Sequence, residues 1–251
     1  MINLGGIKMN DVLTLLRNHR SFRKYKKGVE IPEEKLDAII RAAQAAPSWI
    51  NGQHYSIIAI KDQERKNKMA ELCGNQPYIA ECSVFLCFVA DFHRVKVASD
   101  MHGKSFQIAG EEDLLMVAAT DIGLCMQNAL TAAESLDYGT ICIGGLRRNI
   151  TATAGFLNLP EFVMPVVGLC IGVPDVEAPV KPRLPKEAVY FEETYQTDVM
   201  PLLEAYDQEI IPFSEREGFV SYTERLAKFY DRPYYPNLTE QIKERGFLGG
   251  K

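Results

Sequence analysis

The feature that most constrains the fold of this chain is a long apolar helical pattern across residues 111–136. Apolar side chains recur there three and four residues apart, which is the spacing of one face of an α-helix. Leucines and a valine make the other side apolar as well. We therefore expect a helix that is buried nearly all round, either in the core or at a subunit interface. The first face comprises Leu115, Ala118, Ile122, Cys125, Ala129, Ala132 and Leu136, and the second comprises Leu114, Val117, Leu124 and Leu130.

Four short apolar runs have the length and composition of β-strands, namely HYSIIAI, SVFLCFVA, TICIGG and VMPVVGLCIGVP. Further helices are expected at DVLTLLRN, after Ile31 and Pro32, after the N-cap candidate Asp62, and at NITATAGFLNL. A Rossmann fold is disfavoured, because the expected G-x-G-x-x-G between a strand and its helix is absent. Helices precede the first strand and the strands are few, so we expect an α+β fold with one small sheet wrapped by helices.

The residue pattern of the sequence changes beyond Pro174. Three further prolines follow within residues 175–186, and no apolar periodicity accompanies them. Because only short helical pieces come after, we interpret residues from about 175 to 251 as an arm of a single domain that covers 9–251. Residues 1–8 are interpreted as an N-terminal extension.

Charge and cysteine usage narrow the function classes. The formal net charge is −5, so the broad positive field that neutralises many phosphates is missing and nucleic acid is not expected as a partner. Neither a run of about 18 apolar residues nor a secretory signal is found, which favours a cytoplasmic protein without a membrane partner. The six cysteines form no CxxC pair and are expected to be reduced core thiols.

Two basic segments are candidates for holding a phosphate. In HRSFRKY, Arg20 and Arg23 flank the hydroxyl of Ser21, and arginine matches phosphate oxygens well. A basic helix C-terminus that satisfies its own carbonyls is an equally good interpretation of this segment alone. In PVKPRLP, prolines hold Lys181 and Arg183 on an extended backbone, although a solvated basic linker would have the same pattern.

Outside these two segments, the sequence contains few motifs of ligand binding or catalysis. The pair Gly144 and Gly145 follows a strand and would let the backbone approach a flat ligand, but such a pair is more often only a turn. We find no G-x-S-x-G elbow, no H-E-x-x-H, no Walker loop and no spaced Cys/His metal set. No catalytic side chain or metal ligand is therefore predicted, as expected of a protein whose cofactor carries the chemistry.

Five motifs together resemble the FMN-dependent nitroreductase superfamily. They are HRSFRKY, AAPSWINGQ, GNQPYI, CIGGLRRNI and VKPRLPKEAVYFEETY, in the same order and at similar spacing. The closest resemblance is to the branch of oxygen-insensitive NAD(P)H nitroreductases and NAD(P)H:flavin oxidoreductases, in which IGGLR and KPRLP are distinguishing motifs. It implies a nitroreductase-like fold with a mainly antiparallel sheet and a C-terminal arm exchanged in a homodimer.

The resemblance also implies which residues bind FMN. The phosphate and ribityl chain would meet the first basic segment and the KPRLP motif, Gln76 would contact the ring, and Ser48 would line the flavin of the neighbouring subunit. The turn after TICI would lie along the isoalloxazine, with a glycine amide facing its redox-active nitrogen. The full predicted set is His19, Arg20, Ser21, Arg23, Ser48, Gln76, Cys142, Ile143, Gly144, Gly145, Leu146, Lys181 and Arg183.

The activity implied by the resemblance is ping-pong hydride transfer from NADPH or NADH, through FMN, to a nitroaromatic compound, a quinone or a free flavin. Cations near the ring would stabilise the anionic reduced flavin. A flavin-binding protein without turnover, such as an FMN store or sensor, is the alternative from another class. The second alternative is an enzyme of the same fold with different chemistry, such as a dehalogenase or a flavin-cleaving enzyme. The IGGLR and KPRLP motifs disfavour it.

Two departures from the resembling branch concern the flavin and the electron donor. Cys142 stands where close relatives often carry tyrosine. Arg216 is the nicotinamide-cofactor candidate in the segment where NADPH-selective relatives cluster basic residues, and here it is flanked by Glu215 and Glu217. Because a 2′-phosphate would meet little net attraction there, we expect NADH to be accepted and NADPH preferred by less than about tenfold.

Overall fold

The computed structural model describes residues 10–214 and 221–249, which divide into two compact units. One unit draws on Met1–Ala178 and Asn237–Lys251, and the other is Pro179–Pro236. The extension at residues 1–8 lies outside the described residues, as does Arg216. The expected arm corresponds largely to the second unit, but the residues after Pro236 belong to the first. The assignment of 9–251 to a single domain stays a prediction.

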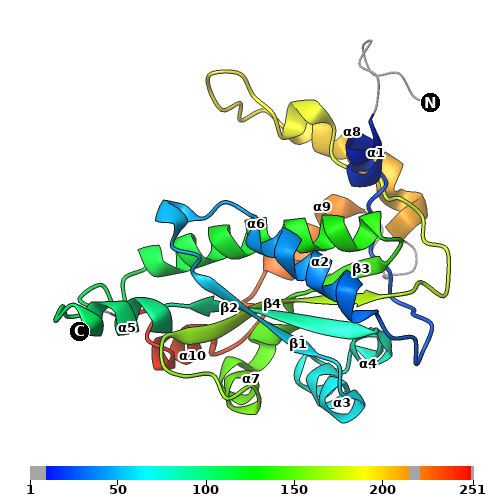
Figure 1. Ribbon diagram of the computed structural model, residues 1–251. Coiled ribbons are helices and arrows are strands. Elements are labelled where there is room, and N and C mark those ends of the chain that lie inside the picture. The colour runs from blue at the N-terminus through cyan, green and yellow to red at the C-terminus, as the bar shows by residue number, and fades with distance from the viewer. Residues whose placement is uncertain (1–9, 215–220, 250–251) are drawn as a thin grey trace. The chain divides into compact units, whose positions relative to one another are not determined.

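The first unit is built on a four-stranded sheet in the order β1-β2-β4-β3, with every neighbouring pair antiparallel (Figure 1). All residues of β2 are buried, because this strand is covered on both faces. A small antiparallel sheet wrapped by helices is what the α+β prediction requires, and that prediction is confirmed. The strands are β1 (Tyr55–Ile60), β2 (Val84–Asp91), β3 (Gly139–Ile143) and β4 (Val163–Gly172).

Alternate residues of β2 face two hydrophobic layers. Leu86 and Phe88 belong to a core with α2 and α6, whereas Phe85 and Cys87 belong to a core with α3 and α4. Figure 1 shows α2 and α6 along one face of the sheet and α3, α4 and α7 along the other. The helices of this unit are α1 (Asp11–Arg17), α2 (Glu33–Gln44), α3 (Gln63–Leu72), α4 (Pro77–Glu81), α5 (His93–Met101), α6 (Asp113–Ser135), α7 (Ile150–Phe156) and α10 (Leu238–Glu244).

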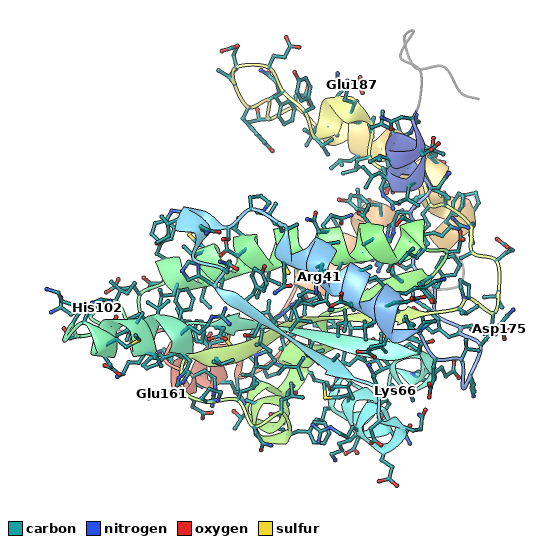
Figure 2. The ribbon with its side chains drawn as sticks, viewed as in Figure 1. Arg41, Lys66, His102, Glu161, Asp175 and Glu187 are labelled. Carbon is teal, nitrogen blue, oxygen red and sulfur yellow. The ribbon has the colours of Figure 1, made fainter. Side chains whose placement is uncertain are left out.

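Several individual residues explain how these helices and strands begin, pair and pack. Asp62 caps α3, with its carboxylate accepting a hydrogen bond from the Arg65 amide at 2.8 Å. Pro165 lies in β4 where the pairing with β2 shifts register, a position that tolerates a residue without an N–H. On α3, the buried Lys66 donates from Nζ to the Cys82 carbonyl at 2.6 Å and so ties α3 to the end of α4 (Figure 2).

The long helix α6 has one buried side and one open side within the chain. Ile122 and Cys125 are buried against the sheet, but Met116 is 69% exposed and Leu124 is 41% exposed. Burial on all sides within one chain is therefore wrong, and the subunit interface remains as the other expected location of the open side. Among the described helices, α6 alone is long and apolar enough to cross a membrane, a test that the core helix of a soluble protein also passes.

Within its described residues, the second unit contains one 3₁₀ turn and two helices: η3 (Lys186–Ala188), α8 (Met200–Ser214) and α9 (Tyr222–Tyr230). Asp207 of α8 accepts hydrogen bonds from both the amide and the hydroxyl of Thr223, which fastens the first turn of α9 to α8. Tyr206 donates its hydroxyl hydrogen to the Pro182 carbonyl at 2.9 Å. The proline-rich segment is thus held by α8.

Candidate functional site

The first basic segment runs along the sheet beside β3 rather than continuing a helix. Helix α1 ends at Arg17, and Ser21 forms an isolated bridge with Thr140, while the Phe22 amide donates to the Thr140 carbonyl at 2.9 Å. These main-chain contacts fix the positions from which the side chains of this segment project.

The side chains of His19 and Arg20 have protein partners. Nδ1 of His19 lies 2.8 Å from Oε1 of Glu134, an oxygen that also accepts from the Thr140 hydroxyl at 2.7 Å. The Arg20 guanidinium donates to the Asn18 carbonyl at 2.9 Å and lies over the Phe22 ring. That bond to Asn18, the C-cap of α1, is the contact expected of a basic helix terminus. The structure therefore accommodates both interpretations of this segment.

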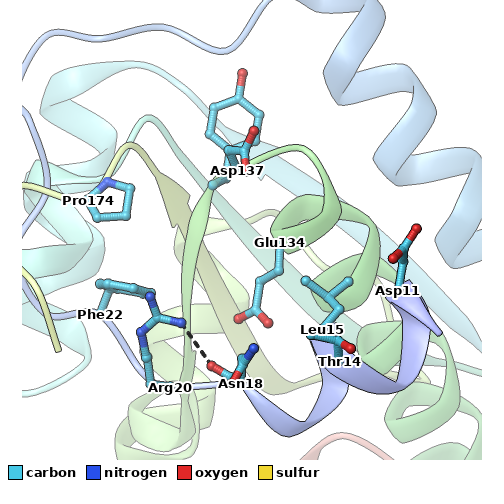
Figure 3. A pocket seen from close by; sticks show the side chains of 10 residues that line it. Asp11, Thr14, Leu15, Asn18, Arg20, Phe22, Glu134, Asp137 and Pro174 are labelled. Atoms are coloured by element: carbon cyan, nitrogen blue, oxygen red, sulfur yellow. Dashed lines mark hydrogen bonds between the residues drawn. The ribbon is translucent and has the colours of Figure 1, made fainter. Parts of the chain in front are cut away.

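A pocket of about 400 Å³ opens beside this network, between α1 and the C-terminal end of α6 (Figure 3). Its charged lining consists of Arg20 and three carboxylates, from Asp11, Glu134 and Asp137. Three carboxylates oppose a phosphate. The pocket therefore gives no support to the phosphate prediction, which stays a prediction for Arg20, Ser21, Arg23 and the second basic segment. The full lining is Asp11, Thr14, Leu15, Asn18, Arg20, Phe22, Glu134, Asp137, Tyr138 and Pro174.

Arg23 belongs to a second cluster, around the turn after β3. Tyr78 donates from its hydroxyl to Oε1 of Gln76 at 2.5 Å. Burial raises the pKa of Tyr78, and the charge of Arg23 together with a hydrogen bond to it opposes that rise. The amide of Gln76 in turn donates to the Cys73 carbonyl at 2.8 Å. Arg23, Tyr78 and Gln76 thus form one polar group.

The two glycines of the turn have different surroundings. A Cβ on Gly145 would lie 2.5 Å from the Cys73 carbonyl oxygen and 2.8 Å from Nε2 of Gln76, so only glycine fits there. A Cβ on Gly144 would meet only the flexible end of Arg147, at 3.4 Å. The turn is therefore packed against the protein at Gly145 and accessible at Gly144.

Two predicted contacts of this turn are limited to the backbone. The side chains of Ile143 and Leu146 are buried in the hydrophobic core on the α3 side of the sheet. Only the main-chain atoms of these two residues can therefore face a ligand. Helix η2 (Gly144–Asn149), which starts at the turn, holds both glycines in this arrangement.

Cys142 corrects the expectation that all six cysteines are core thiols. The other five are buried, but Cys142 is exposed on β3, and all six are free thiols. Its position on β3, an edge strand of the sheet, permits this exposure. The surrounding protein raises the pKa of the Cys142 thiol, and the carboxylate of Glu134 raises it further.

The remaining predicted residues lie on other elements. Ser48 accepts a hydrogen bond from the Gln53 amide at 3.1 Å, in the loop before β1. Lys181 and Arg183 belong to the second unit, where the Arg183 guanidinium donates to the Lys181 carbonyl at 2.8 Å. The convergence of these two residues with Arg20 and Arg23 stays a prediction.

The donor set of the first unit suits FMN. Arg23 and Gln76 offer hydrogen-bond donors for anionic and carbonyl oxygens, and the accessible backbone at Gly144 allows a flat ring to approach. Among the described residues, no cluster of three or more His, Cys, Asp or Glu side chains could hold a metal ion. The sequence reasoning missed Tyr78, although it stands two residues after Gln76 in the same motif.

The geometry defines a protein with an open turn for a flat ligand and basic residues nearby. Residues 16–173 match the nitroreductase family, and residues 181–249 match the nitroreductase family C-terminal domain. The chain belongs to the nitroreductase family, as its motifs predicted.

Relatives span nearly the whole chain. A Bacillus subtilis protein named FMN reductase, NAD(P)H, is 40% identical over 246 residues, covering 95% of this chain and 98% of the relative. A Salmonella typhimurium protein named oxygen-insensitive NADPH nitroreductase is 36% identical and covers 95% and 99%. The solved structure of the NADPH:FMN oxidoreductase from Vibrio harveyi, complexed with NAD⁺, superposes with a TM-score of 0.86 at 31% identity, covering 95% and 99%.

Proposed function

We propose that this protein is an FMN-dependent NAD(P)H oxidoreductase that reduces nitro compounds, quinones or free flavins by ping-pong hydride transfer. The observation that carries the proposal is the polar group of Arg23, Tyr78 and Gln76 beside an accessible glycine turn, in a nitroreductase-family chain. The names of the relatives, which specify FMN and NAD(P)H, support the same cofactor and donor.

Each part of FMN has candidate residues in this chain. Arg20, Ser21 and Arg23 would bind the phosphate and ribityl side, joined by Lys181 and Arg183 of the second unit. His19 would support this segment through its contact with Glu134. Gln76 would hydrogen-bond the ring, and the backbone of Gly144 would lie along it. Ser48 would approach from the partner subunit.

The chemistry that FMN supplies when bound is acceptance of a hydride from the nicotinamide and delivery of two electrons to the acceptor. The protein positions the ring and sets its electrostatic surroundings. The charge of Arg23 acts on Tyr78, whose hydroxyl donates to Gln76, so Arg23 would favour negative charge on the part of the cofactor near this group. The buried side of Gly145 keeps the turn fixed, whereas the open side at Gly144 leaves room for donor and acceptor in alternation.

We further propose a cytoplasmic homodimer. The exposed Met116 and Leu124 on α6 form an apolar side that a second subunit would cover. Exposed apolar residues on α1, Val12 and Leu16, extend the apolar surface that association would bury. In this proposal the C-terminal arm embraces the partner and the two FMN sites lie at the interface. The acceptor is a small flat molecule, and neither nucleic acid nor membrane is proposed as a partner.

The test is FMN titration of the purified protein, followed by NAD(P)H oxidation with an added quinone. About one FMN should bind per chain, in a dimer by sedimentation. Arg20→Ala should weaken FMN roughly tenfold, since a charge-assisted hydrogen bond contributes about 1.5 kcal/mol. Lys96→Ala, which removes an exposed ion pair with Asp100, is the matched control and should leave affinity unchanged.

The outcomes separate the candidate functions. FMN binding without turnover would favour the flavin store or sensor, and turnover only of a halogenated or flavin substrate with bond cleavage would favour the other chemistries of the fold. Protein that takes up no FMN contradicts the proposal.

A further inference from the structure

The loop of residues 48–53, which joins α2 to β1, has an unusual backbone. Ile50, Asn51 and Gln53 all have positive φ, at 48°, 56° and 52°. This left-handed region is costly for most residues, and most of all for a β-branched one such as isoleucine. Gly52 is required as well, because a Cβ there would lie 2.1 Å from the His54 ring. Contacts outside the loop must therefore hold this conformation.

Asp121 of α6 supplies the first set of contacts. Its carboxylate is fully buried and accepts hydrogen bonds from the Trp49 amide at 2.9 Å and from the His54 amide at 3.1 Å. Oδ2 also lies 2.9 Å from Nδ1 of His54, whose ring stacks on Phe92 at 4.9 Å between centroids. One side chain thus joins the beginning of the loop to its end.

Arg94 of α5 supplies the second set. Its guanidinium donates to the carbonyls of Gln53 at 2.5 Å and Tyr55 at 2.7 Å, and to the hydroxyl of Ser56 at 2.9 Å. An ion pair of 3.1 Å with Asp91 orients it. Arg94 therefore fixes the carbonyl of Gln53 at the end of the loop and that of Tyr55 at the start of β1.

The loop held in this way contributes nothing to the core. Residues 49–53 are all exposed, with Trp49 at 57% and Ile50 at 74%. Burying a carboxylate is costly unless it is hydrogen-bonded, and the hydrogen bonds that offset the cost of burying Asp121 order a loop whose residues 49–53 face outward. Such an arrangement is expected where the outer surface of the loop must have a defined shape for a ligand or partner.

We propose that Asp121 and Arg94 are positioning residues that hold the 48–53 loop in the conformation needed against the FMN bound by the partner subunit. This inference rests on the proposed function, in which Ser48 approaches the flavin from across the interface. Asp121 and His54 act on the amides of the loop, and Arg94 acts on its carbonyls. Loosening either set should therefore weaken FMN, although neither Asp121 nor Arg94 is proposed to touch it.

The test compares two loop variants and a control in the full-length protein, with Arg94→Lys as a conservative fourth variant. Arg94→Met keeps the aliphatic stem on a half-exposed side chain but removes the hydrogen bonds to Gln53 and Tyr55. His54→Phe keeps a ring for stacking on Phe92 and removes the Nδ1 contact. The control is Arg41→Met, which breaks an exposed arginine–carboxylate pair with Asp37 within α2 and removes no hydrogen bond to the loop (Figure 2).

Two readouts are taken for each variant. The first is the FMN dissociation constant, expected to rise about tenfold in Arg94→Met and in His54→Phe and to stay unchanged in Arg41→Met. The second is the fluorescence anisotropy of Trp49, which is the single tryptophan of the chain and lies in the loop. Anisotropy should fall in the two loop variants without FMN present, because it reports the loop itself.

Unchanged FMN affinity with lowered anisotropy would show that the contacts only stabilise the loop, and would overturn the proposal. Equal loss of affinity in Arg41→Met would overturn it too. Wild-type protein that fails to bind FMN would instead refute the proposed function, a failure recognised before any substitution is made. Partial recovery of FMN affinity in Arg94→Lys, which retains one donor group, would support the positioning role.

Discussion

The turn after β3 and the 48–53 loop are both proposed to meet FMN, yet they are held by opposite kinds of contact. The turn is fixed by close packing, with Gly145 against the Cys73 carbonyl and Leu146 in the core. The loop is exposed throughout residues 49–53 and is fixed by hydrogen bonds to Asp121 and Arg94.

This difference determines which substitutions each segment tolerates. A closely packed turn has no free volume, so it is sensitive to added atoms. Apart from Gly52, the hydrogen-bonded loop has free space around its side chains, but it depends on each donor and acceptor, because an unpaired buried group costs about 1–3 kcal/mol. Volume changes should therefore damage the turn, and loss of polar partners should damage the loop.

The largest effect is expected from Gly145→Ala. The new Cβ would lie 2.5 Å from a backbone oxygen, so the turn or the α3–α4 connection must shift. We expect a loss of about 2–3 kcal/mol in the free energy of unfolding, typical of an overpacked site, and a loss of FMN binding. Urea unfolding and FMN titration measure the two effects.

The control for that substitution is Gly155→Ala on α7, where a Cβ would meet nothing within 4 Å. This change should be neutral or stabilise by up to about 1 kcal/mol, because alanine favours the helix. Equal stabilities of the two variants would mean that the turn is not closely packed and would remove the contrast between the two segments.

A smaller effect, of opposite sign, is expected in the loop from Ile50→Asn. Ile50 has a φ of 48° and is 74% exposed, so its replacement removes backbone strain and little packing within the chain. Asparagine tolerates this conformation, and we expect a gain of about 1 kcal/mol in the free energy of unfolding. Thermal and urea unfolding at fixed protein concentration provide the measurement. A clear loss of stability would place Ile50 in contact with another subunit.

Much of the fold follows from local patterns in the sequence. The continuously apolar run at residues 83–90 became β2, and Asp62 became the cap of α3, because strand burial and capping depend on neighbouring residues. Helix α5 was not predicted. None of its residues is buried, so it lacks the apolar face by which a helix is recognised in a sequence.

The residues of the candidate site also divide into those that a local motif predicted and those that it did not. Arg23, Gln76 and Gly145 were predicted because each stands in a short motif, and the structure brings Arg23 and Gln76 to the same tyrosine. Asp121 was missed because its partner His54 lies 67 residues away along the chain. Glu134 was missed for a similar reason, since its contact with His19 spans 115 residues. Contacts of such separation leave no pattern in a single sequence.

The smallest expected effect tests the polar surroundings of β3, next to the turn. Desolvation by the surrounding protein and the carboxylate of Glu134 both raise the pKa of the Cys142 thiol, although its side chain reaches the surface, so at neutral pH a smaller fraction is thiolate than in a free cysteine. Iodoacetamide should therefore modify Cys142 slowly at neutral pH and faster as the pH rises toward the raised pKa.

Glu134→Gln removes one of the two causes of the raised pKa and keeps an oxygen that can accept a hydrogen bond from Thr140. The pKa should fall, and the rate at a fixed pH should increase by less than about tenfold. The other five cysteines are buried, so mass spectrometry can assign the label to Cys142 in the native protein. An unchanged or lower rate in Glu134→Gln would show that the carboxylate does not act on this thiol, and that the edge of β3 is governed by packing alone, as the turn is.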